Sequence, residues 1–420
     1  MYKFAHMADI HIGAYSNKFL KELEIKSFNQ ALDKCVELQV DFILISGDFF
    51  NSAKPDLDII YNLLNKLVEV KNLKIPIYVL YGSHDYAIGS KCIIDILEGC
   101  NVITKIPKNS EIEDNSLTIE FLSDPKTGVK ITGIPARKKG LERDSYKKLN
   151  REKLENEPGF KIFMFHSGIV EFKPPIPTKY IISLSDFPKE FNYYAGGHIH
   201  TRDEFRQDKY GPIVYPGPLI TGYGKDLLST IKGKKRGFYL VSFDNEIKEV
   251  QFIDLHLLDK KGQHFQYDLN GKNSIEVNDE LEELKNKDMS KKIIVLEFVG
   301  KLDSGDVSDI TKNLRKIKNV LIDNGAHYVK AIWPNTKSDS SKNLDENLLN
   351  VDNNSIIEKT VFENNRSSSN MSTKLLKDKN EISTSEALLE IFRQDDSGKN
   401  SLKGASNLLD LSQFFEEEEN

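Results

Sequence analysis

The chain has 420 residues, more than one hydrophobic core normally holds, so at least two domains are expected. Its net charge of -6 at pH 7 argues weakly against a protein that coats nucleic acid by charge alone, although local basic patches remain possible. Three cysteines without a Cys-x-x-Cys pair, an N-terminus without a signal-peptide pattern and the lack of any apolar run of ~20 residues predict a cytoplasmic protein with no membrane segment.

Residues 1–100 alternate between short apolar runs and stretches with helical spacing. Lys3–Ala8, Phe42–Ile45 and Ile75–Leu80 are predicted strands, and the continuous apolar run Phe42–Ile45 indicates burial on both faces. Two helices are predicted between them, one through Phe28, Ala31, Leu32 and Cys35, and one through Ile59, Ile60, Leu63, Leu64 and Leu67. Strands that alternate with helices imply parallel β-α-β units.

The middle of the chain has shorter apolar runs. Residues 117–134 predict a hairpin with its turn at Asp124–Gly128. Further strands are predicted at Ile162–Phe165, Tyr193–Ala195, Pro212–Pro218 and Gly237–Phe243. We therefore expect residues 1–249 to form one layered α/β domain.

Residues 250–333 predict a separate small α/β domain with the order strand, helix, strand, helix, strand, for which about 80 residues suffice. The predicted strands are Glu249–His256, Lys292–Val299 and His327–Trp333, and the predicted helices are Val277–Lys287 and Asp306–Asn324.

The composition changes after Trp333. Residues 334–382 are rich in Ser, Asn, Asp and Lys, which predicts a disordered linker. Residues 383–420 begin with a capping-box pattern and carry two apolar stripes, Leu388, Ile391 and Phe392, then Leu408, Leu411 and Phe415. Helices without an adjacent domain typically dock on a partner. The alternatives are a weakly structured tail or packing against the first domain.

Residue types that can bind metal ions occur immediately after five apolar runs. The five groups are Asp9 with His11, Asp48, Ser83 with His84 and Asp85, His166, and His198 with His200. In open α/β sheets, sites lie at the carboxyl ends of strands, so five such ends can meet in one polar pocket. Neighbouring glycines let the backbone turn sharply at these ends.

Each group alone is a weak signal, because a single histidine is more often a surface or core residue. His198 and His200 carry more weight, since alternate positions of an extended segment face the same way. The ordered set of five is far more specific than any one member. His6, His256, His264 and His327 belong to no group and are predicted to be structural or surface residues.

The ligand types indicate a reaction. Mixed imidazole and carboxylate ligands suit Mn, Fe or Zn better than Ca or Mg, and the lack of thiolates argues against structural zinc. Two cations ~3.5–4 Å apart can activate a water and stabilise the leaving oxygen of a phosphodiester. The residues therefore predict a two-metal phosphoesterase.

The same residues resemble the calcineurin-like metallophosphoesterases, whose ordered motifs are Asp-x-His, Gly-Asp, Gly-Asn-His-Asp/Glu, His and Gly-His-x-His. Phe4–His11, Ser46–Phe50, Gly197–His200 and Val214–Gly217 are similar to the motifs of the archaeal Mre-eleven (Mre11) nucleases and their bacterial relative SbcD. The resemblance covers residues 1–333. It implies a four-layer α/β/β/α sandwich with a smaller α/β capping domain that binds DNA, and a partner-binding tail.

The resemblance also implies two Mn²⁺ ions per subunit. One ion would be held by Asp9, His11, Asp48 and His200, and the second by Asp48, Ser83, His166 and His198, with Asp48 bridging both. His84 would be the general acid that gives a proton to the leaving oxygen. Asp85 would orient either His84 or its loop.

Two positions depart from the family pattern. The family has Asn where this chain has Ser83, and a hydroxyl is a shorter and usually weaker ligand than an amide oxygen. Many members have His where this chain has Asn51, and that histidine helps to place the phosphate. Neither departure removes a charged ligand, so the activity is still expected.

The resemblance implies a 3′–5′ exonuclease and single-strand endonuclease in double-strand break repair, acting as a homodimer with a coiled-coil ATPase of the Rad-fifty type bound through the tail. Basic candidates for DNA contact are Lys138, Lys139, Arg143, Lys232, Lys234, Lys235 and Arg236, each of which alone is more simply a solvated surface residue. Two alternatives stay open: a phosphoesterase acting on a small or protein substrate, and a scaffold with a metal site weakened by Ser83.

Overall fold

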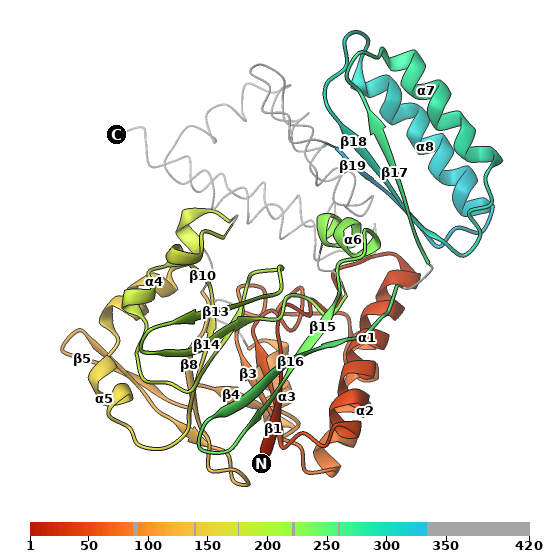
Figure 1. Cartoon of the computed structure of the whole chain (residues 1–420). Coiled ribbons are helices and arrows are strands. Elements are labelled where there is room, and N and C mark those ends of the chain that lie inside the picture. The colour runs from red at the N-terminus through yellow and green to blue at the C-terminus, as the bar shows by residue number, and fades with distance from the viewer. Residues whose placement is uncertain (87–90, 138–139, 175, 221–222, 259–260, 334–420) are drawn as a thin grey trace, which may run out of the picture. The chain divides into compact units, whose positions relative to one another are not determined.

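A computed structural model describes residues 1–86, 91–137, 140–174, 176–220, 223–258 and 261–333. The linker predicted at 334–382 and the helical tail predicted at 383–420 lie outside the described residues, as do Lys138 and Lys139. Two six-stranded sheets make up most of the described chain (Figure 1). Within the described ranges, no helix has the length and apolar character needed to cross a membrane.

The first sheet has the strand order β16-β15-β1-β2-β3-β4. Its bounds are Tyr2–Met7 for β1, Phe42–Ser46 for β2, Ile77–Leu80 for β3, Thr104–Ile106 for β4, Gly237–Phe243 for β15 and Ile247–Asp254 for β16. β1, β2 and β3 are parallel neighbours, which confirms the predicted β-α-β units. The helices packed on this sheet are α1 (Lys18–Glu37), α2 (Leu57–Asn72) and α3 (Ile93–Gly99), through a core that includes Phe28, Ile43 and Leu63.

The second sheet has the strand order β13-β14-β12-β9-β8-β7. Its bounds are Leu122–Ser123 for β7, Lys130–Ile134 for β8, Lys161–His166 for β9, Tyr193–Gly197 for β12, Asp203–Gln207 for β13 and Tyr210–Tyr215 for β14. α4 (Glu142–Lys148) and α5 (Arg151–Glu155) contribute Tyr146 and Leu154 to a core on this sheet. Phe42 and Met164 belong to a core shared by the two sheets. The predicted four-layer sandwich is therefore confirmed.

The predicted hairpin at residues 117–134 is only partly present. β7 and β8 pair antiparallel around the predicted turn, with Leu122 opposite Ile131. The earlier part, β6 (Ser116–Ile119), instead pairs with β5 (Ser110–Glu113) in a two-stranded sheet. Strand alternation identifies a half-buried strand but does not choose its partner, so the sequence pattern could not separate these hairpins.

A small α/β unit follows the sandwich. β17 (Gly262–Asp268), β18 (Ile293–Val299) and β19 (Tyr328–Ile332) form a parallel sheet, and α7 (Ser274–Glu282) and α8 (Val307–Asp323) pack on it. The strand predicted at Glu249–His256 forms as β16, but it pairs with β15 in the first sheet. The first strand of the small unit is therefore β17 rather than the strand predicted at Glu249–His256.

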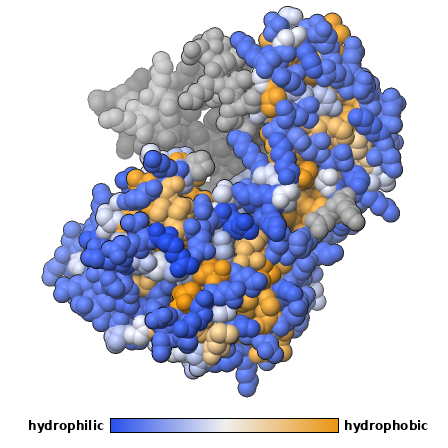
Figure 2. Space-filling view, viewed as in Figure 1, coloured by the Kyte–Doolittle hydropathy of each residue, from blue (hydrophilic) through white to orange (hydrophobic). Residues whose placement is uncertain are grey.

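Helix α6 (Gly224–Ile231) contacts both the sandwich and the small unit. Leu20 and Leu23 of α1, Leu227 of α6 and Ile293 of β18 share one buried apolar cluster. Lys232, which follows the helix, donates to Oε2 of Glu297 on β18 at 2.6 Å. On the face seen in Figure 2, hydrophilic side chains cover much of the described surface, with apolar patches between them.

Candidate metal centre

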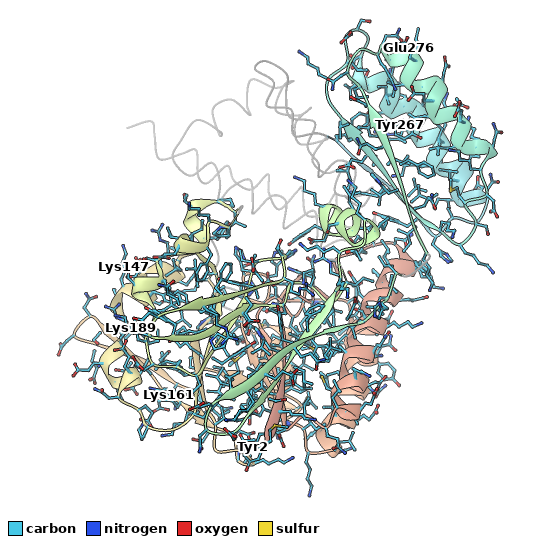
Figure 3. The ribbon with its side chains drawn as sticks, viewed as in Figure 1. Tyr2, Lys147, Lys161, Lys189, Tyr267 and Glu276 are labelled. Atoms are coloured by element: carbon cyan, nitrogen blue, oxygen red, sulfur yellow. The ribbon has the colours of Figure 1, made fainter. Side chains whose placement is uncertain are left out.

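The five predicted groups all lie at the carboxyl ends of parallel strands. Tyr2 and Lys161, the first residues of β1 and β9, lie at one edge of the sandwich in Figure 3, so these strands end toward the opposite edge. The groups come after β1, β2 and β3 in the first sheet and at or after the ends of β9 and β12 in the second sheet. This is the sheet edge at which α/β folds bind ligands.

The backbone at these strand ends adopts an uncommon conformation. Asp9, His11, Asp48 and His198 have φ angles of 53°, 50°, 48° and 82°, in the left-handed region that non-glycine residues rarely occupy. Such conformations cost of order 1–3 kcal/mol each and gather at functional sites. A Cβ on Gly47 would lie 2.2 Å from Nδ1 of His166, so only glycine lets the two sheets close at this point.

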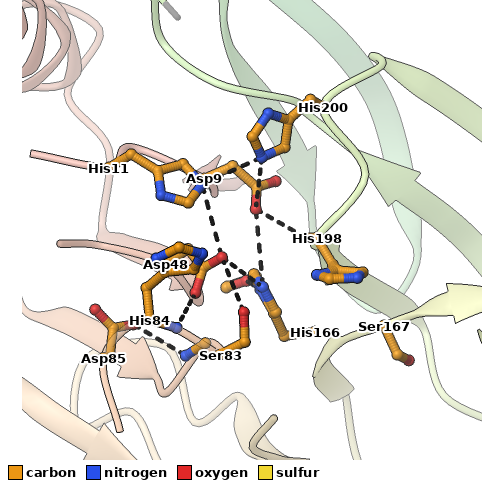
Figure 4. Close-up of polar contacts among 12 residues, drawn as sticks. Asp9, His11, Asp48, Ser83, His84, Asp85, His166, Ser167, His198 and His200 are labelled. Carbon is orange, nitrogen blue, oxygen red and sulfur yellow. Dashed lines mark hydrogen bonds and ion pairs between the residues drawn. The ribbon is translucent and has the colours of Figure 1, made fainter. Parts of the chain in front are cut away.

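The side chains converge in three overlapping groups. These are Asp9, His11 and His200; His11, Asp48 and His84; and Asp48, His166 and His198, each with donor atoms within 4.8 Å of one another. Nε2 of His11 lies 3.1 Å from Nε2 of His200, and Nε2 of His166 lies 3.1 Å from Oδ2 of Asp48. Figure 4 shows this convergence of side chains from the two sheets. The structure thus brings together every histidine and aspartate predicted as a ligand.

Hydrogen bonds outside the cluster fix which nitrogen of two histidines faces it. Nδ1 of His166 lies 2.8 Å from the backbone carbonyl of Ser46, which can only accept, so Nδ1 carries the proton. Nδ1 of His200 lies 2.6 Å from Oδ2 of Asp226 in the same kind of contact. In both residues Nε2 therefore faces the cluster.

Burial and charge shift the pKa values of the cluster in different directions. Burial lowers the pKa of His11 and of His198 to about 3. Burial also disfavours a charged His166, but the Asp48 carboxylate outweighs it and raises the pKa of His166 to about 10. Burial raises the pKa of Asp9. A buried cluster with this mixture of charges is typical of a functional site.

His84 is held at both ring nitrogens. Nδ1 lies 2.9 Å from the backbone carbonyl of Asn51, and Nε2 lies 2.9 Å from the hydroxyl of Tyr223. Its backbone amide also donates to Oδ1 of Asp48 at 2.9 Å. A single histidine therefore links the cluster to the loop after β2 and to the residue before α6.

Asp85 contacts the loops rather than the His84 ring. Its carboxylate accepts backbone N–H groups from Phe49 at 3.2 Å, Phe50 at 2.9 Å and Gly82 at 2.9 Å. Burial raises the pKa of Asp85 to about 6. Of the two roles expected for Asp85, these contacts favour the orientation of the loop.

The buried donor atoms also fit a divalent cation. Oδ2 of Asp9 has no hydrogen-bond partner within the described residues, and Nε2 of His166 has only its ion-pair contact with Asp48. Buried polar atoms are normally paired, because an unpaired one costs ~1–3 kcal/mol. Two imidazole nitrogens 3.1 Å apart, beside two carboxylates, form a donor set of the kind that binds transition-metal cations.

Comparison with known proteins agrees with this geometry. Residues 2–202 match the family model described as calcineurin-like phosphoesterase. The chain is 30% identical over 366 residues to the DNA double-strand break repair protein Mre11 of Methanococcus maripaludis, which covers 83% of this chain and 86% of that protein. The chain belongs to the Mre11 family. The Mre11 proteins of Methanocaldococcus jannaschii and Sulfurisphaera tokodaii are 28% and 27% identical to it, over 76% and 81% of this chain and 89% and 82% of theirs.

Ser83, one of the two departures from the Mre11 family pattern, lies at the cluster. Its hydroxyl is 3.4 Å from Oδ2 of Asp48 and therefore near the position predicted for the second cation. At Asn51, the other departure, the backbone carbonyl contacts His84, while the buried side-chain oxygen has no described hydrogen-bond partner. Both departures from the family thus adjoin the site.

Sequence reasoning missed three residues that contact the cluster. Tyr223, Asp226 and the Ser46 carbonyl each bond to a predicted site histidine. No motif marks Tyr223 or Asp226, because they lie more than twenty residues after the last ligand motif and reach it only through the fold. The apolar spacing of Leu227, Leu228 and Ile231 was the only available signal of α6.

Arg236, a candidate for DNA contact or else a solvated surface residue, is instead buried. The residue is 5% exposed, and its guanidinium donates to the backbone carbonyl of His200 at 3.0 Å, so it cannot reach a phosphate. Lys232 is paired with Glu297, and Nζ of Lys234 donates to Thr201. Among the described residues, Arg143 and Lys235 are exposed and remain candidates for DNA contact, although Nζ of Lys235 lies 3.8 Å from Oδ2 of Asp254.

The four histidines predicted to be structural or surface residues lie outside the three groups. His6 is buried, with Nδ1 3.0 Å from the Tyr193 hydroxyl and Nε2 3.0 Å from the Ser46 hydroxyl. His264 contacts Glu297, and His327 stacks on Phe19 at a centroid distance of 3.8 Å. His256 is exposed. Their surroundings agree with the prediction.

Proposed function

We propose that this chain is a manganese-dependent two-metal nuclease that processes DNA ends in double-strand break repair, with 3′–5′ exonuclease and single-strand endonuclease activity. The observation that carries the proposal is the convergence of buried imidazole and carboxylate donors from five strand ends of two sheets. The names of the relatives, DNA double-strand break repair protein Mre11, favour DNA as the substrate over a small phosphoester.

The donor atoms divide naturally between two cations. Asp9, His11, Asp48 and His200 would hold the first, and Asp48, Ser83, His166 and His198 the second. Asp48 would belong to both sets, because its Oδ2 lies 3.6 Å from Nε2 of His11 and 3.1 Å from Nε2 of His166. When bound, the two cations would activate a water and neutralise charge on the phosphodiester. Imidazole with carboxylate favours Mn²⁺ over Mg²⁺.

His84 would supply the proton for the leaving oxygen. Nδ1 faces a carbonyl that can only accept, so Nδ1 keeps its proton, and His84 acting as an acid would carry a second proton on Nε2, the one given to the leaving oxygen. Asp85 would act indirectly, since its three backbone contacts hold the loops that carry Asp48 and His84.

Residues 1–258 would form the nuclease domain, and residues 262–333 the capping domain that meets DNA. The exposed side of α8 carries Lys312, Lys316 and Arg315, which could meet phosphates along the duplex. The tail at 383–420 would bind a coiled-coil ATPase of the Rad-fifty type, as the family resemblance implies. Pull-down with a chain truncated after Trp333 tests this, and undiminished binding would reject it.

A homodimer is proposed on the exposed face of α2. Leu57, Tyr61 and Val68 are 84%, 69% and 39% exposed, and their spacing places them on one stripe of the helix. Ile96 of α3 is 56% exposed. Apolar stripes of this kind mark protein–protein contacts, and a second copy would cover the same residues on both partners.

The decisive experiment is digestion of labelled linear duplex and of single-stranded circles with Mn²⁺. The full chain should degrade both, and His84→Ala should lose ~10²–10⁴-fold in kcat while keeping its metals. Hydrolysis of a small phosphomonoester with no cleavage of DNA would favour the rival phosphoesterase instead. Equal activity of the chain and of His84→Ala would exclude His84 as the acid.

A further inference from the structure

Asp226 contacts the candidate metal centre from outside the set of ligands. Its Oδ2 lies 2.6 Å from Nδ1 of His200. A carboxylate next to an imidazole accepts the Nδ1 proton and leaves the lone pair on Nε2. That nitrogen lies 3.1 Å from Nε2 of His11 and 3.9 Å from Oδ1 of Asp9, so the lone pair is directed into the first cation position.

A buried arginine fixes Asp226 against His200. The guanidinium of Arg236 donates from one nitrogen to the His200 carbonyl at 3.0 Å and from another to the Asp226 carbonyl at 3.2 Å. The second nitrogen also lies 3.6 Å from Oδ1 of Asp226. The Arg236 side chain thereby holds the backbone of His200 and the backbone of Asp226 together. A rigid guanidinium fork suits this role better than a lysine would.

The start of α6 restrains the His200 ring from a second side. Tyr223, the residue that precedes the helix, stacks on the ring with a centroid distance of 5.4 Å and an interplanar angle of 5°. Leu227 in the first turns is fully buried, which anchors the helix in the apolar cluster with α1. His200 is therefore held at its edge by Asp226 and on its face by Tyr223.

We propose that Asp226 is a positioning residue that sets the tautomer and the aim of His200 and so determines the affinity of the first cation. The inference rests on the proposed function, because it requires a cation at His200. The simpler explanation is an acid in the first turn of a helix, which stabilises the helix dipole and nothing more. Asp309 occupies that position in α8 without any contact to the cluster, and so provides a matched control.

The test is a calorimetric Mn²⁺ titration of the full chain after removal of metal by a chelator. Asp226→Ala should weaken the site containing His200 by about 10–100-fold and leave the other site unchanged. Asp226→Asn keeps an oxygen that accepts from Nδ1 but loses the charge, so its loss should be smaller, at least about threefold. Asp309→Ala should bind both cations as the unmodified chain does.

Unchanged titrations for Asp226→Ala would overturn the proposal. If Asp226→Ala does not fold, Asp226→Asn decides alone, and an affinity equal to that of the unmodified chain would overturn the inference. A loss that is equal at both sites, or matched by Asp309→Ala, would assign Asp226 to helix stability instead. Failure of the unmodified chain to bind any cation would refute the proposed function itself, so the two failures are distinguishable.

Discussion

Ser83 is the shortest side chain among the predicted ligands. Its hydroxyl reaches Oδ2 of Asp48 at 3.4 Å, and an amide at this position would extend further toward the second cation. Ser83→Asn should therefore tighten the weaker of two Mn²⁺ sites by about tenfold, equivalent to ~1.4 kcal/mol, in a calorimetric titration. Ser123→Asn, an exposed serine of β7, is the control. Equal affinities for Ser83→Asn and the unmodified chain would contradict this.

His6 makes the fold sensitive to acid. Burial lowers the pKa of His6 to about 3 from an ordinary value of 6.5, so the unfolded chain binds a proton that the folded chain excludes between these values. The stability that the neutral ring contributes is complete above pH 6.5 and falls by about 1.4 kcal/mol per pH unit below it. His6→Gln keeps polar groups without titrating. In chelator-treated protein, the unfolding free energy of His6→Gln should fall less between about pH 7 and about pH 5 than that of the unmodified chain. An equal fall in both proteins would contradict this prediction.

Residue types predicted the residues of the candidate site well, but they did not predict the residues that hydrogen-bond to the site histidines. The aspartates and histidines follow apolar runs directly, so their position at strand ends was readable from the sequence. Asp226 and Tyr223 reach the site only because α6 folds back toward it, and that return depends on packing across the whole sandwich. The burial of Arg236 could not be predicted from the sequence either, because a run of basic residues normally lies on the surface.

At the scale of elements, the exposed stripe of α2 carries the dimer proposal. Tyr61→Glu places a charge at the centre of the stripe and should weaken self-association by at least about tenfold, or ~1.4 kcal/mol. Sedimentation equilibrium measures it. Asn62→Glu adds the same charge to an exposed position away from the stripe and should leave association unchanged. Dimers of equal stability in both variants would place the contact elsewhere.

Buried apolar strands were predictable from the sequence, and short helices were not. Apolar residues predominate in the strands that became β1, β2, β3, β9 and β12, because most of their positions are buried in the sandwich. The helices α3, α4 and α5 span only 7, 7 and 5 residues, too few for a clear helical period. β16 was assigned to the wrong sheet because its partial burial fits an edge strand of either one.

At the scale of the molecule, bound cations should stabilise the sandwich. Each site adds ~2.7 kcal/mol to the free energy of unfolding when free Mn²⁺ is a hundred times its dissociation constant. Addition of a chelator should therefore lower the thermal midpoint, as followed by circular dichroism. In Asp48→Asn, which alters both cation positions, the chelator should have much less effect. A midpoint of the unmodified chain that does not depend on Mn²⁺ would contradict binding at this centre.

The ligands come from two sheets that meet only when the sandwich is complete. The first sheet supplies Asp9, His11 and Asp48 and the second supplies His166, His198 and His200, so neither sheet alone would offer the full donor set proposed for either cation. Metal capture is therefore expected as the last event of assembly. Bound ions would then join the two halves of the sandwich, so a molecule that opens far enough to separate its sheets would also release its metal.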